Sequence, residues 1–242
     1  MDRISPAQRP RRPAVMVQDW HHLLFLHWVV SAEQLRPLVP LELELDTFDA
    51  NAYVGLIPFT MSGVRPPFAP PLGPLSRSHE VNVRTYVHFR GADPGVWFFS
   101  LDASNPLAVI GARAFFKLPY FPARMDLREQ GGAIDYFSER QLAGPRPAIC
   151  RARYRSLDAP SPARPGTLAH FLVERYVLYT RSGNRLYRGR VHHRPYSLQS
   201  AEVPFLDESL IAAAGIRRPS SQPLMHYARG VHVDVFGLER VS

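Results

Sequence analysis

Cysteine and lysine are almost absent from the chain. Among 242 residues Cys150 is the only cysteine, and Lys117 is the only lysine among the 29 basic residues. A single cysteine excludes an internal disulfide and a zinc site built from several cysteines. Because the residues flanking Cys150 are typical of a strand, we expect a buried thiol with little reactivity.

Long apolar runs are also missing. No run approaches the ~20 residues that a membrane-spanning helix needs. The basic N-terminus is not followed by the uninterrupted apolar segment of a secretory signal. We therefore expect a cytoplasmic protein without a membrane partner.

Familiar cofactor and catalytic motifs do not occur either. The chain has no Gly-rich phosphate loop, metalloprotease helix motif or nucleophile elbow, so the sequence predicts no cofactor. His21 and His27 would share one face of a strand, but no carboxylate stands at a matching spacing. His192 and His193 are neighbours and would point to opposite faces of a strand. The sequence therefore predicts no metal site.

Positive charge is abundant but not clustered. The formal net charge is +8, and arginine is spread through nearly every segment. A nucleic-acid surface would gather arginines and aromatic residues on one face. The densest group, Arg151, Arg153 and Arg155, alternates with Cys150, Ala152 and Tyr154, as on the solvent face of a strand. We expect no nucleic-acid partner.

The apolar residues fall into many short runs separated by prolines and turn residues. This pattern predicts a mainly β fold, an antiparallel barrel or cone with a few short helices. Strands are predicted at residues 21–30, 52–61, 80–89, 96–103, 109–118, 134–138, 149–154 and 224–235, a hairpin at 174–193, and helices at 31–39, 168–172 and 206–214. Pro58 predicts an edge or a bulge in its strand. The proline-rich loop 63–76 is placed to lie over a pocket mouth.

The domain organisation is simple. Residues 1–13 are basic and proline-rich and predict a mobile arm. Residues 14–242 predict one β domain, because the linker at 156–166 is too short to mark a firm boundary.

The segment from Glu80 to Phe89 alternates strictly between polar and apolar residues. One face carries Glu80, Asn82, Arg84, Tyr86 and His88. Such a face is either the solvated side of an antiparallel sheet or the polar lining of a barrel, where these groups converge on a ligand. The alternation alone favours the solvated face.

Arg113 and Lys117 stand out in the predicted strand 109–118. An arginine in an apolar run needs a partner, either a protein carboxylate such as Glu80 or Asp102 or the carboxylate of a ligand. A lysine desolvated among aromatic residues can form a Schiff base with a carbonyl substrate. The alternative is that the stem of Lys117 packs on apolar surface while its ammonium group reaches water.

Several stretches together resemble one family. They are W-H-H-L-L-F-L-H-W, L-V-P-L-E-L-E-L-D-T-F-D, E-V-N-V-R-T-Y-V, F-F-S-L-D-A, A-R-A-F-F-K-L-P-Y, F-L-V-E-R-Y-V-L-Y-T and H-H-R-P-Y-S-L-Q-S-A. They resemble the YqjF-like family of uncharacterised bacterial proteins, domain of unknown function 2071, which is grouped with the acetoacetate decarboxylase-like superfamily. The resemblance implies a cone-shaped antiparallel β-barrel with a central cavity.

The resemblance also bears on the chemistry. The decarboxylases carry a motif whose lysine forms the Schiff base. Set against it, A-R-A-F-F-K-L-P-Y matches Arg113 to the motif arginine and Pro119 to its proline. The lysine position then falls on Tyr120 and the glutamate position on Ala114. The resemblance implies a carboxylate-handling pocket, with Glu80 as a second acid facing it, but not the covalent chemistry.

Three hypotheses follow from the sequence. In the first, the barrel binds a small organic acid or carbonyl compound: Arg113 and Arg84 anchor the anion, Glu80, Asn82 and Tyr120 orient it, and Glu80 or Tyr120 transfers a proton. In the second, Lys117 makes the protein a Schiff-base enzyme. In the third, Arg113 and Glu80 form a buried structural pair without catalysis. The ligand, the reaction and assembly into a homo-oligomer stay open.

Overall fold

The computed structural model describes residues 1–71, 73–141 and 148–241. Its strands are β1 (Met16–Val30), β2 (Glu44–Leu45), β3 (Ala52–Arg65), β4 (Ser78–Phe89), β5 (Ala92–Ala103), β6 (Tyr120–Gln130), β7 (Ala133–Arg140), β8 (Ile149–Ser156), β9 (Ser161–Pro162), β10 (Val177–Ser182), β11 (Arg185–His192), β12 (Ser197–Glu208) and β13 (Leu224–Arg240). The α-helices are short: α1 (Ala32–Leu35), α2 (Pro106–Gly111), α3 (Leu168–Val173) and α4 (Leu210–Ala213). Three 3-10 turns, η1 (Ser5–Ala7), η2 (Arg36–Leu38) and η3 (Gly73–Ser76), and one π-helical turn, η4 (Ala112–Phe116), complete the elements.

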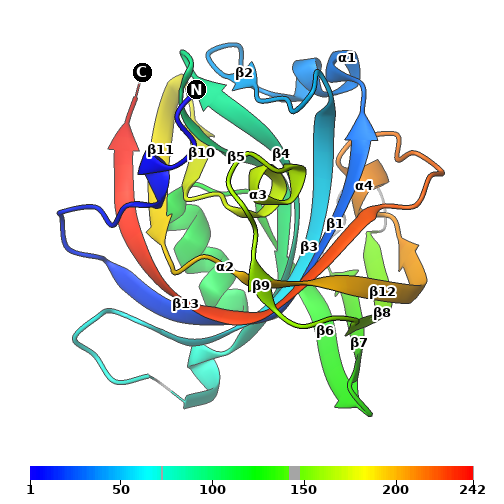
Figure 1. Cartoon of the computed structure of the whole chain (residues 1–242). Helices are drawn as coiled ribbons and strands as arrows, with labels where there is room; N and C mark the ends of the chain where they lie inside the picture. Colours follow the sequence, from blue (N-terminus) through cyan, green and yellow to red (C-terminus); the bar gives the residue numbers. More distant parts are fainter. Residues whose placement is uncertain (72, 142–147, 242) are drawn as a thin grey trace.

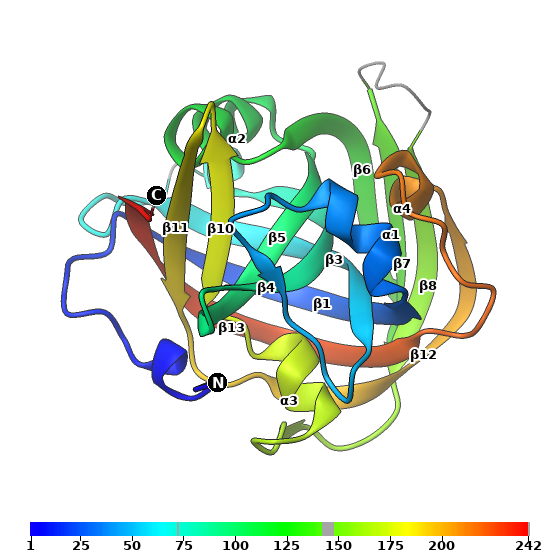
Figure 2. The ribbon, with the colours of Figure 1, turned by 90° about the horizontal axis from the view of Figure 1, so that it is seen from above.

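The strands form one sheet that returns on itself. Its order is β2-β4-β3-β1-β13-β11-β10-β5-β6-β7-β8-β12-β9, and β4 also pairs with β5 while β13 also pairs with β12. Seven strands, β4, β3, β1, β13, β11, β10 and β5, therefore make a closed circuit of hydrogen-bonded neighbours (Figures 1 and 2). The pairings of β5 with β6 and β10 are parallel, whereas β4 pairs antiparallel with both β3 and β5.

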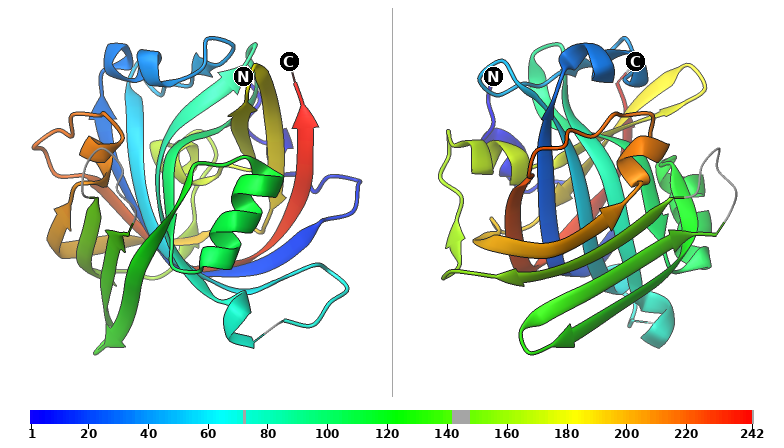
Figure 3. Two further views of the ribbon diagram at one scale, coloured as in Figure 1. Left: turned by 180° about the vertical axis from the view of Figure 1, so that it is seen from behind. Right: turned by 90° about the vertical axis from the view of Figure 1, so that its right-hand side faces the viewer.

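Strand β4 is buried on both faces. Val81 and Val83, on the face opposite Glu80, belong to a core cluster with Tyr136, Tyr154 and other residues from β7, β8 and α4. The part of the sheet formed by β6, β7, β8 and β12 lies over that side of the circuit (Figure 3, right). The alternation predicted a strand correctly, but the polar face is not the solvated face, because these four strands cover the apolar side and the polar residues that line the cavity turn inward.

The predicted strand 109–118 is wrong. The chain there forms α2 and then η4, and Lys117 ends the turn in the left-handed region with φ of 54°. Asn105 and Pro106 begin the helix: the Asn105 side chain accepts hydrogen bonds from the backbone N–H groups of Leu107 and Ala108. The apolar residues of this run are not all buried, since Phe115 is 78% exposed.

Two smaller predictions change as well. Strand β3 is an interior strand, so Pro58 does not mark an edge; it lies where the register between β1 and β3 shifts, as the alternative of a bulge predicts. The helix expected at 206–214 is shorter, because residues 206–208 extend β12 and α4 begins at Leu210.

Other local predictions are confirmed. Helices begin near the residues expected, at 31 and 168: Ser31 caps α1 and Thr167 caps α3, each accepting a hydrogen bond from a backbone N–H in the first turn. Strands β10 and β11 form the expected hairpin. The Cys150 side chain is fully buried, and burial raises the pKa of its thiol. Arg151, Arg153 and Arg155 point to solvent.

The N-terminal residues pack onto the domain. The guanidinium of Arg3 donates two hydrogen bonds to the carboxylate of Asp46, at 2.5 and 2.6 Å. Arg9 pairs with Asp234 at 3.0 Å. Two arginines of the predicted arm thus contact the domain, and the mobility of residues 1–13 stays a prediction. Among the described residues no helix is long and apolar enough to cross a membrane.

Candidate functional site

A cavity of about 710 Å³ lies within the circuit of seven strands, and every strand of the circuit contributes to its lining. Most of the wall is apolar; Leu23, Phe59 and Phe98 are examples. Glu80, Asn82 and Arg84 of β4 line it together with Tyr120. The cavity therefore combines apolar walls with a few polar groups, as small-molecule sites usually do, and its volume is typical of them.

The carboxylate of Glu80 lies at the centre of the polar group. Glu80 is 2% exposed; the Tyr120 hydroxyl donates to its Oε2 at 2.7 Å and the Asn82 amide to its Oε1 at 3.4 Å. Burial raises the pKa of Glu80 to about 7, although the two hydrogen bonds favour the ionised form. A carboxyl group with such a pKa can both accept and donate a proton near neutral pH.

Two tyrosine hydroxyls hold Glu80 in place, one through its backbone and one through its side chain. The Tyr136 hydroxyl donates to the backbone carbonyl of Glu80 at 2.8 Å and so ties β4 to β7. Burial, followed by the charge of Glu80, raises the pKa of Tyr120 well above its usual value. Tyr120 therefore keeps its proton at neutral pH and serves as a hydrogen-bond donor.

Arg84 lies further along the same face of β4. Its Nη2 donates to the backbone carbonyl of Leu172 at 3.3 Å, and the Tyr86 hydroxyl donates to the same oxygen at 2.8 Å. Among the described residues Arg84 forms no ion pair with a carboxylate, and its buried Nε has no hydrogen-bond partner. Arg84 thus brings a positive charge to the cavity without a protein carboxylate to balance it.

Sequence reasoning missed several polar residues of the lining, and two of them have a buried nitrogen without a hydrogen-bond partner. Arg175 has its Nη1 2.7 Å from Asp46, while its buried Nη2 has no partner. The buried indole Nε1 of Trp20 also has no partner. Arg175 lies just after α3, and Trp20 lies between Asp19 and His21, so no local alternation indicates where either side chain points.

Arg113 is not in the cavity. It is exposed on η4, and its Nε donates to the backbone carbonyl of Tyr120 at 2.7 Å. The buried arginine–carboxylate pair of this region is Arg140–Asp102, with Nη2 2.7 Å from Oδ1. Arg113 and Glu80 therefore form no structural pair, and the placement of Arg113 beside Glu80 was wrong because residues 112–116 are helical.

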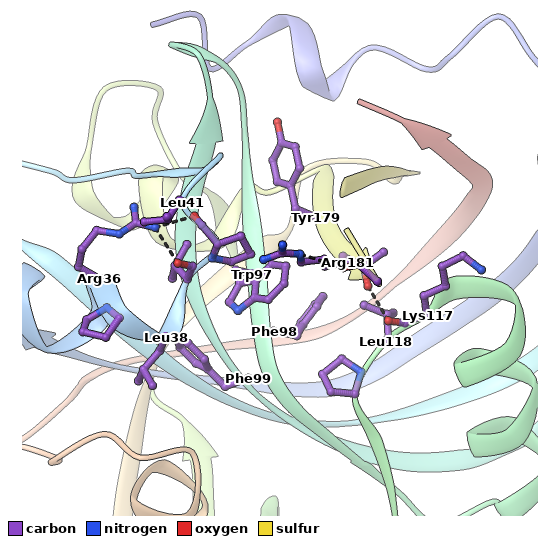
Figure 4. A pocket seen from close by; sticks show the side chains of 16 residues that line it. Arg36, Leu38, Leu41, Trp97, Phe98, Phe99, Lys117, Leu118, Tyr179 and Arg181 are labelled. Carbon is purple, nitrogen blue, oxygen red and sulfur yellow. Dashed lines mark hydrogen bonds between the residues drawn. The ribbon is translucent and has the colours of Figure 1, made fainter. Parts of the chain in front are cut away.

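Lys117 lies outside the cavity as well. Together with Leu118 and Arg181 it borders a separate hollow on the outer side of β5 and β10, and its side chain points away from the labelled aromatic residues there (Figure 4). Its Nζ stands 5.5 Å from the centre of the Tyr187 ring. The chain's single lysine is thus not among the residues that surround Glu80.

The histidines do not combine into a metal centre. His21 bonds Ser62 at 2.8 Å and His27 bonds the Tyr86 hydroxyl at 2.6 Å. Within the described part of the chain no group of three or more histidine, cysteine or acidic residues is arranged to hold a metal ion.

Solved structures with this fold include enzymes. The chain superposes on the enduracididine biosynthesis enzyme MppR complexed with pyruvate with a TM-score of 0.65 and 12% identity, covering 97% of this chain and 93% of that one. MppR complexed with the condensation product of pyruvate and imidazole 4-carboxaldehyde gives 0.69 and 12%, covering 96% and 90%. Acetoacetate decarboxylase from Legionella pneumophila subsp. pneumophila str. Philadelphia 1 gives 0.64 and 15%, covering 98% and 92%. At these identities the likeness shows a fold of the acetoacetate decarboxylase-like type.

Sequence comparison reaches a nearer relative. The uncharacterised protein YqjF of Bacillus subtilis (strain 168) is 44% identical over 228 residues, which cover 94% of this chain and 93% of YqjF. Residues 17–232 match the model of an uncharacterised conserved protein family, DUF2071. The chain therefore belongs to the DUF2071 family.

Proposed function

We propose that the cavity inside the strand circuit binds a small organic acid or carbonyl compound, and that the circuit acts as a cone-shaped barrel around it. The observation that carries the proposal is the pairing, in one cavity, of a buried protonatable carboxyl group, Glu80, with an arginine that lacks a carboxylate partner, Arg84. Arg84 is half-buried, and an anionic ligand would supply the carboxylate partner that its guanidinium lacks. The complex of MppR with pyruvate supports a ligand of this class.

Glu80 and Tyr120 are the groups that we assign to proton transfer. As a carboxylate, Glu80 takes a proton from the carbon next to a bound carbonyl group, and the electron pair of that C–H bond moves toward the carbonyl oxygen. The Tyr120 hydroxyl donates its single proton to Oε2 of Glu80, and once Glu80 has taken up the proton that hydroxyl can turn to the carbonyl oxygen and stabilise its negative charge by a hydrogen bond. Protonated Glu80 then returns the proton, so atoms and charge balance without a further reactant.

A Schiff base is not part of this proposal. Lys117 is the only lysine and does not line the cavity. Tyr120, which the resemblance sets at the lysine position of the decarboxylases, offers a phenol where an amine would be needed. Anion binding and proton transfer need no amine.

Binding is tested with a panel of oxo-substituted monocarboxylates, measured by isothermal titration calorimetry. We expect at least one member to bind the wild type and Arg84→Met to weaken that binding about 10- to 100-fold, since one charge-assisted contact is lost. Arg190→Met is the matched control, because Arg190 is a partly buried arginine paired with Asp93 and is not part of the lining. No binding by any member, or equal losses in both variants, would refute the site.

Proton transfer has its own readout. In D₂O the wild type should speed exchange of the hydrogens next to the ligand carbonyl, followed by proton NMR. Glu80→Gln keeps a hydrogen-bonding group in place but cannot carry the proton, so we expect it to bind without accelerating exchange. Exchange that survives in this variant would show that Glu80 is not the proton carrier.

A further inference from the structure

Tyr196 brings a second tyrosine to the cavity, on the side of Arg84. It lies in the loop between β11 and β12 and lines the cavity together with Phe25 and Arg84. The ring of Tyr196 stands 5.2 Å from that of Phe25 at an angle of 70°, and Cζ of Arg84 lies 5.9 Å from the centre of the same Phe25 ring. Tyr196 and Arg84 therefore flank one aromatic side chain of the wall.

The hydroxyl of Tyr196 has no hydrogen-bond partner within residues 1–71, 73–141 and 148–241, although only 3% of the residue is exposed. This oxygen is also not one of the unpartnered polar atoms that the protein encloses completely, as it encloses Nε of Arg84. The hydroxyl is therefore accessible from the cavity that Tyr196 lines. Because buried tyrosines usually give their O–H group a partner, a molecule in the cavity is left to provide one here.

Arg84 offers an accessible donor of its own. Its Nη2 donates to the carbonyl of Leu172 and its Nε is enclosed, whereas Nη1 is neither bonded nor enclosed in the described part of the chain. Burial raises the pKa of Tyr196, and the charge of Arg84 opposes that rise without cancelling it, so the phenol keeps its proton and acts as a donor. Two donors beside one another suit a carboxylate, which accepts several hydrogen bonds.

The side chain of Tyr196 is held in place from behind. Oε1 of the buried Glu174 accepts a hydrogen bond from the backbone N–H of Tyr196 at 2.9 Å, and Oε2 accepts one from the hydroxyl of Tyr176. The ring of His193 packs 4.5 Å from the ring of Tyr196. A donor that is fixed before a ligand arrives costs little entropy to use, so the hydroxyl is preorganised for binding.

We propose that Tyr196 determines specificity in this cavity: its hydroxyl donates a hydrogen bond to the same ligand carboxylate that Arg84 binds. This inference rests on the proposed function and names a second group that recognises the acid. The carboxylate then meets Arg84 and Tyr196, while Glu80 and Tyr120 remain for the carbonyl group. An amide in place of the carboxylate has one acceptor oxygen instead of two and carries no charge, so the two donors select against it.

The test is a double-mutant cycle of Arg84→Met and Tyr196→Phe, measured by isothermal titration calorimetry with pyruvate, 2-oxobutanoate, acetoacetate and 4-oxopentanoate. We expect Tyr196→Phe to weaken binding of an acid about tenfold, because one hydrogen bond to a charged group is lost. In the Arg84→Met background the same change should weaken binding at least about threefold less, since both residues hold one carboxylate. Losses that multiply independently would show that the two residues contact different groups and would refute the proposal.

Stability separates a binding role of the hydroxyl from a structural one. Because the Tyr196 hydroxyl has no partner among the described residues, Tyr196→Phe should leave the urea midpoint of unfolding unchanged. Tyr176→Phe removes a hydrogen bond to the buried Glu174 and should lower that midpoint. A lowered midpoint in Tyr196→Phe together with unchanged affinity would make the hydroxyl structural and overturn the inference.

The matched control for binding is Tyr53→Phe. Tyr53 is also 3% exposed but does not line the cavity, so its change should leave affinity unaltered. Equal losses in Tyr53→Phe and Tyr196→Phe would refute a specific contact. If binding depends on Arg84 but not on Tyr196, the proposed function stands and the role of Tyr196 falls. If no acid binds, or none depends on Arg84, both fail.

Discussion

Replacing Glu80 by glutamine should remove a pH-dependent loss of stability. Burial raises the pKa of Glu80 from 4.5 to about 7. The unfolded chain ionises Glu80 near pH 4.5, whereas the folded chain holds the proton until about pH 7, so the folded state binds more protons between these values. The contribution of Glu80 to the unfolding free energy is therefore fully present below pH 4.5 and is lost as the pH rises through 7.

The size of this loss follows from the pKa change. At about 1.36 kcal/mol per pKa unit, the difference corresponds to roughly 3 kcal/mol. Glutamine has the shape of glutamate and its side-chain oxygen can still accept from Tyr120, but it does not ionise. The difference in unfolding free energy, wild type minus Glu80→Gln, should therefore fall by roughly 3 kcal/mol between pH 4 and pH 8.

The measurement is urea unfolding followed by circular dichroism at several pH values. Buried histidines also make stability depend on pH; burial lowers the pKa of His193 to about 4, for example. Because both proteins contain the same histidines, the difference between their unfolding free energies removes this contribution. Glu33→Gln, an exposed acid at the start of α1, is the matched control. A wild-type-minus-variant difference that stays constant from pH 4 to pH 8 would refute the buried, protonated carboxyl group.

Three further predictions use other parts of the site. Arg140→Met should cost about 3–5 kcal/mol in urea unfolding at neutral pH, because it leaves the buried carboxylate of Asp102 without its partner; a cost near zero would contradict the buried ion pair. Borohydride treatment with pyruvate or acetoacetate should leave Lys117 unlabelled in mass spectrometry, and a specific adduct there would overturn the exclusion of a Schiff base. Tyr120→Phe removes a hydrogen bond to ionised Glu80, so the pKa of Glu80 should rise above 7. The difference in unfolding free energy between Tyr120→Phe and the double variant with Glu80→Gln should then have its midpoint above pH 7; an unchanged midpoint would show that this hydrogen bond does not act on Glu80.

The sequence predicted strands well where the period of two was long and uninterrupted. Strand β4 shows this pattern and lies almost where the alternation placed it. Run 109–118 lacks clear alternation, and its cap at Asn105 indicates a helix as readily as a turn. An apolar run alone does not distinguish a strand from a helix. Because of this ambiguity Arg113 was predicted to line the cavity, whereas it is exposed on η4.

The direction of the polar face was beyond local reasoning. Whether Glu80 meets solvent or a cavity depends on the strands that cover Val81 and Val83, and these strands come from distant segments between Tyr120 and Glu208. The same holds for Arg175, whose partner Asp46 lies 129 residues earlier in the chain. Such pairings are set by tertiary packing, so they leave no periodic signal in the sequence.

Tyr120 shows how one residue type changes what a pocket can do. An ammonium group 2.7 Å from Glu80 would favour the ionised carboxylate and lower its pKa, whereas a phenol at this distance supplies only a hydrogen bond. Burial therefore outweighs the phenol, and Glu80 keeps a pKa of about 7. A lysine at this position would place a nucleophile beside an ionised carboxylate; tyrosine places a hydrogen-bond donor beside a carboxyl group with a pKa of about 7. These surroundings are those that the reversible proton transfer we propose would require, whereas covalent capture of a carbonyl compound would require an amine.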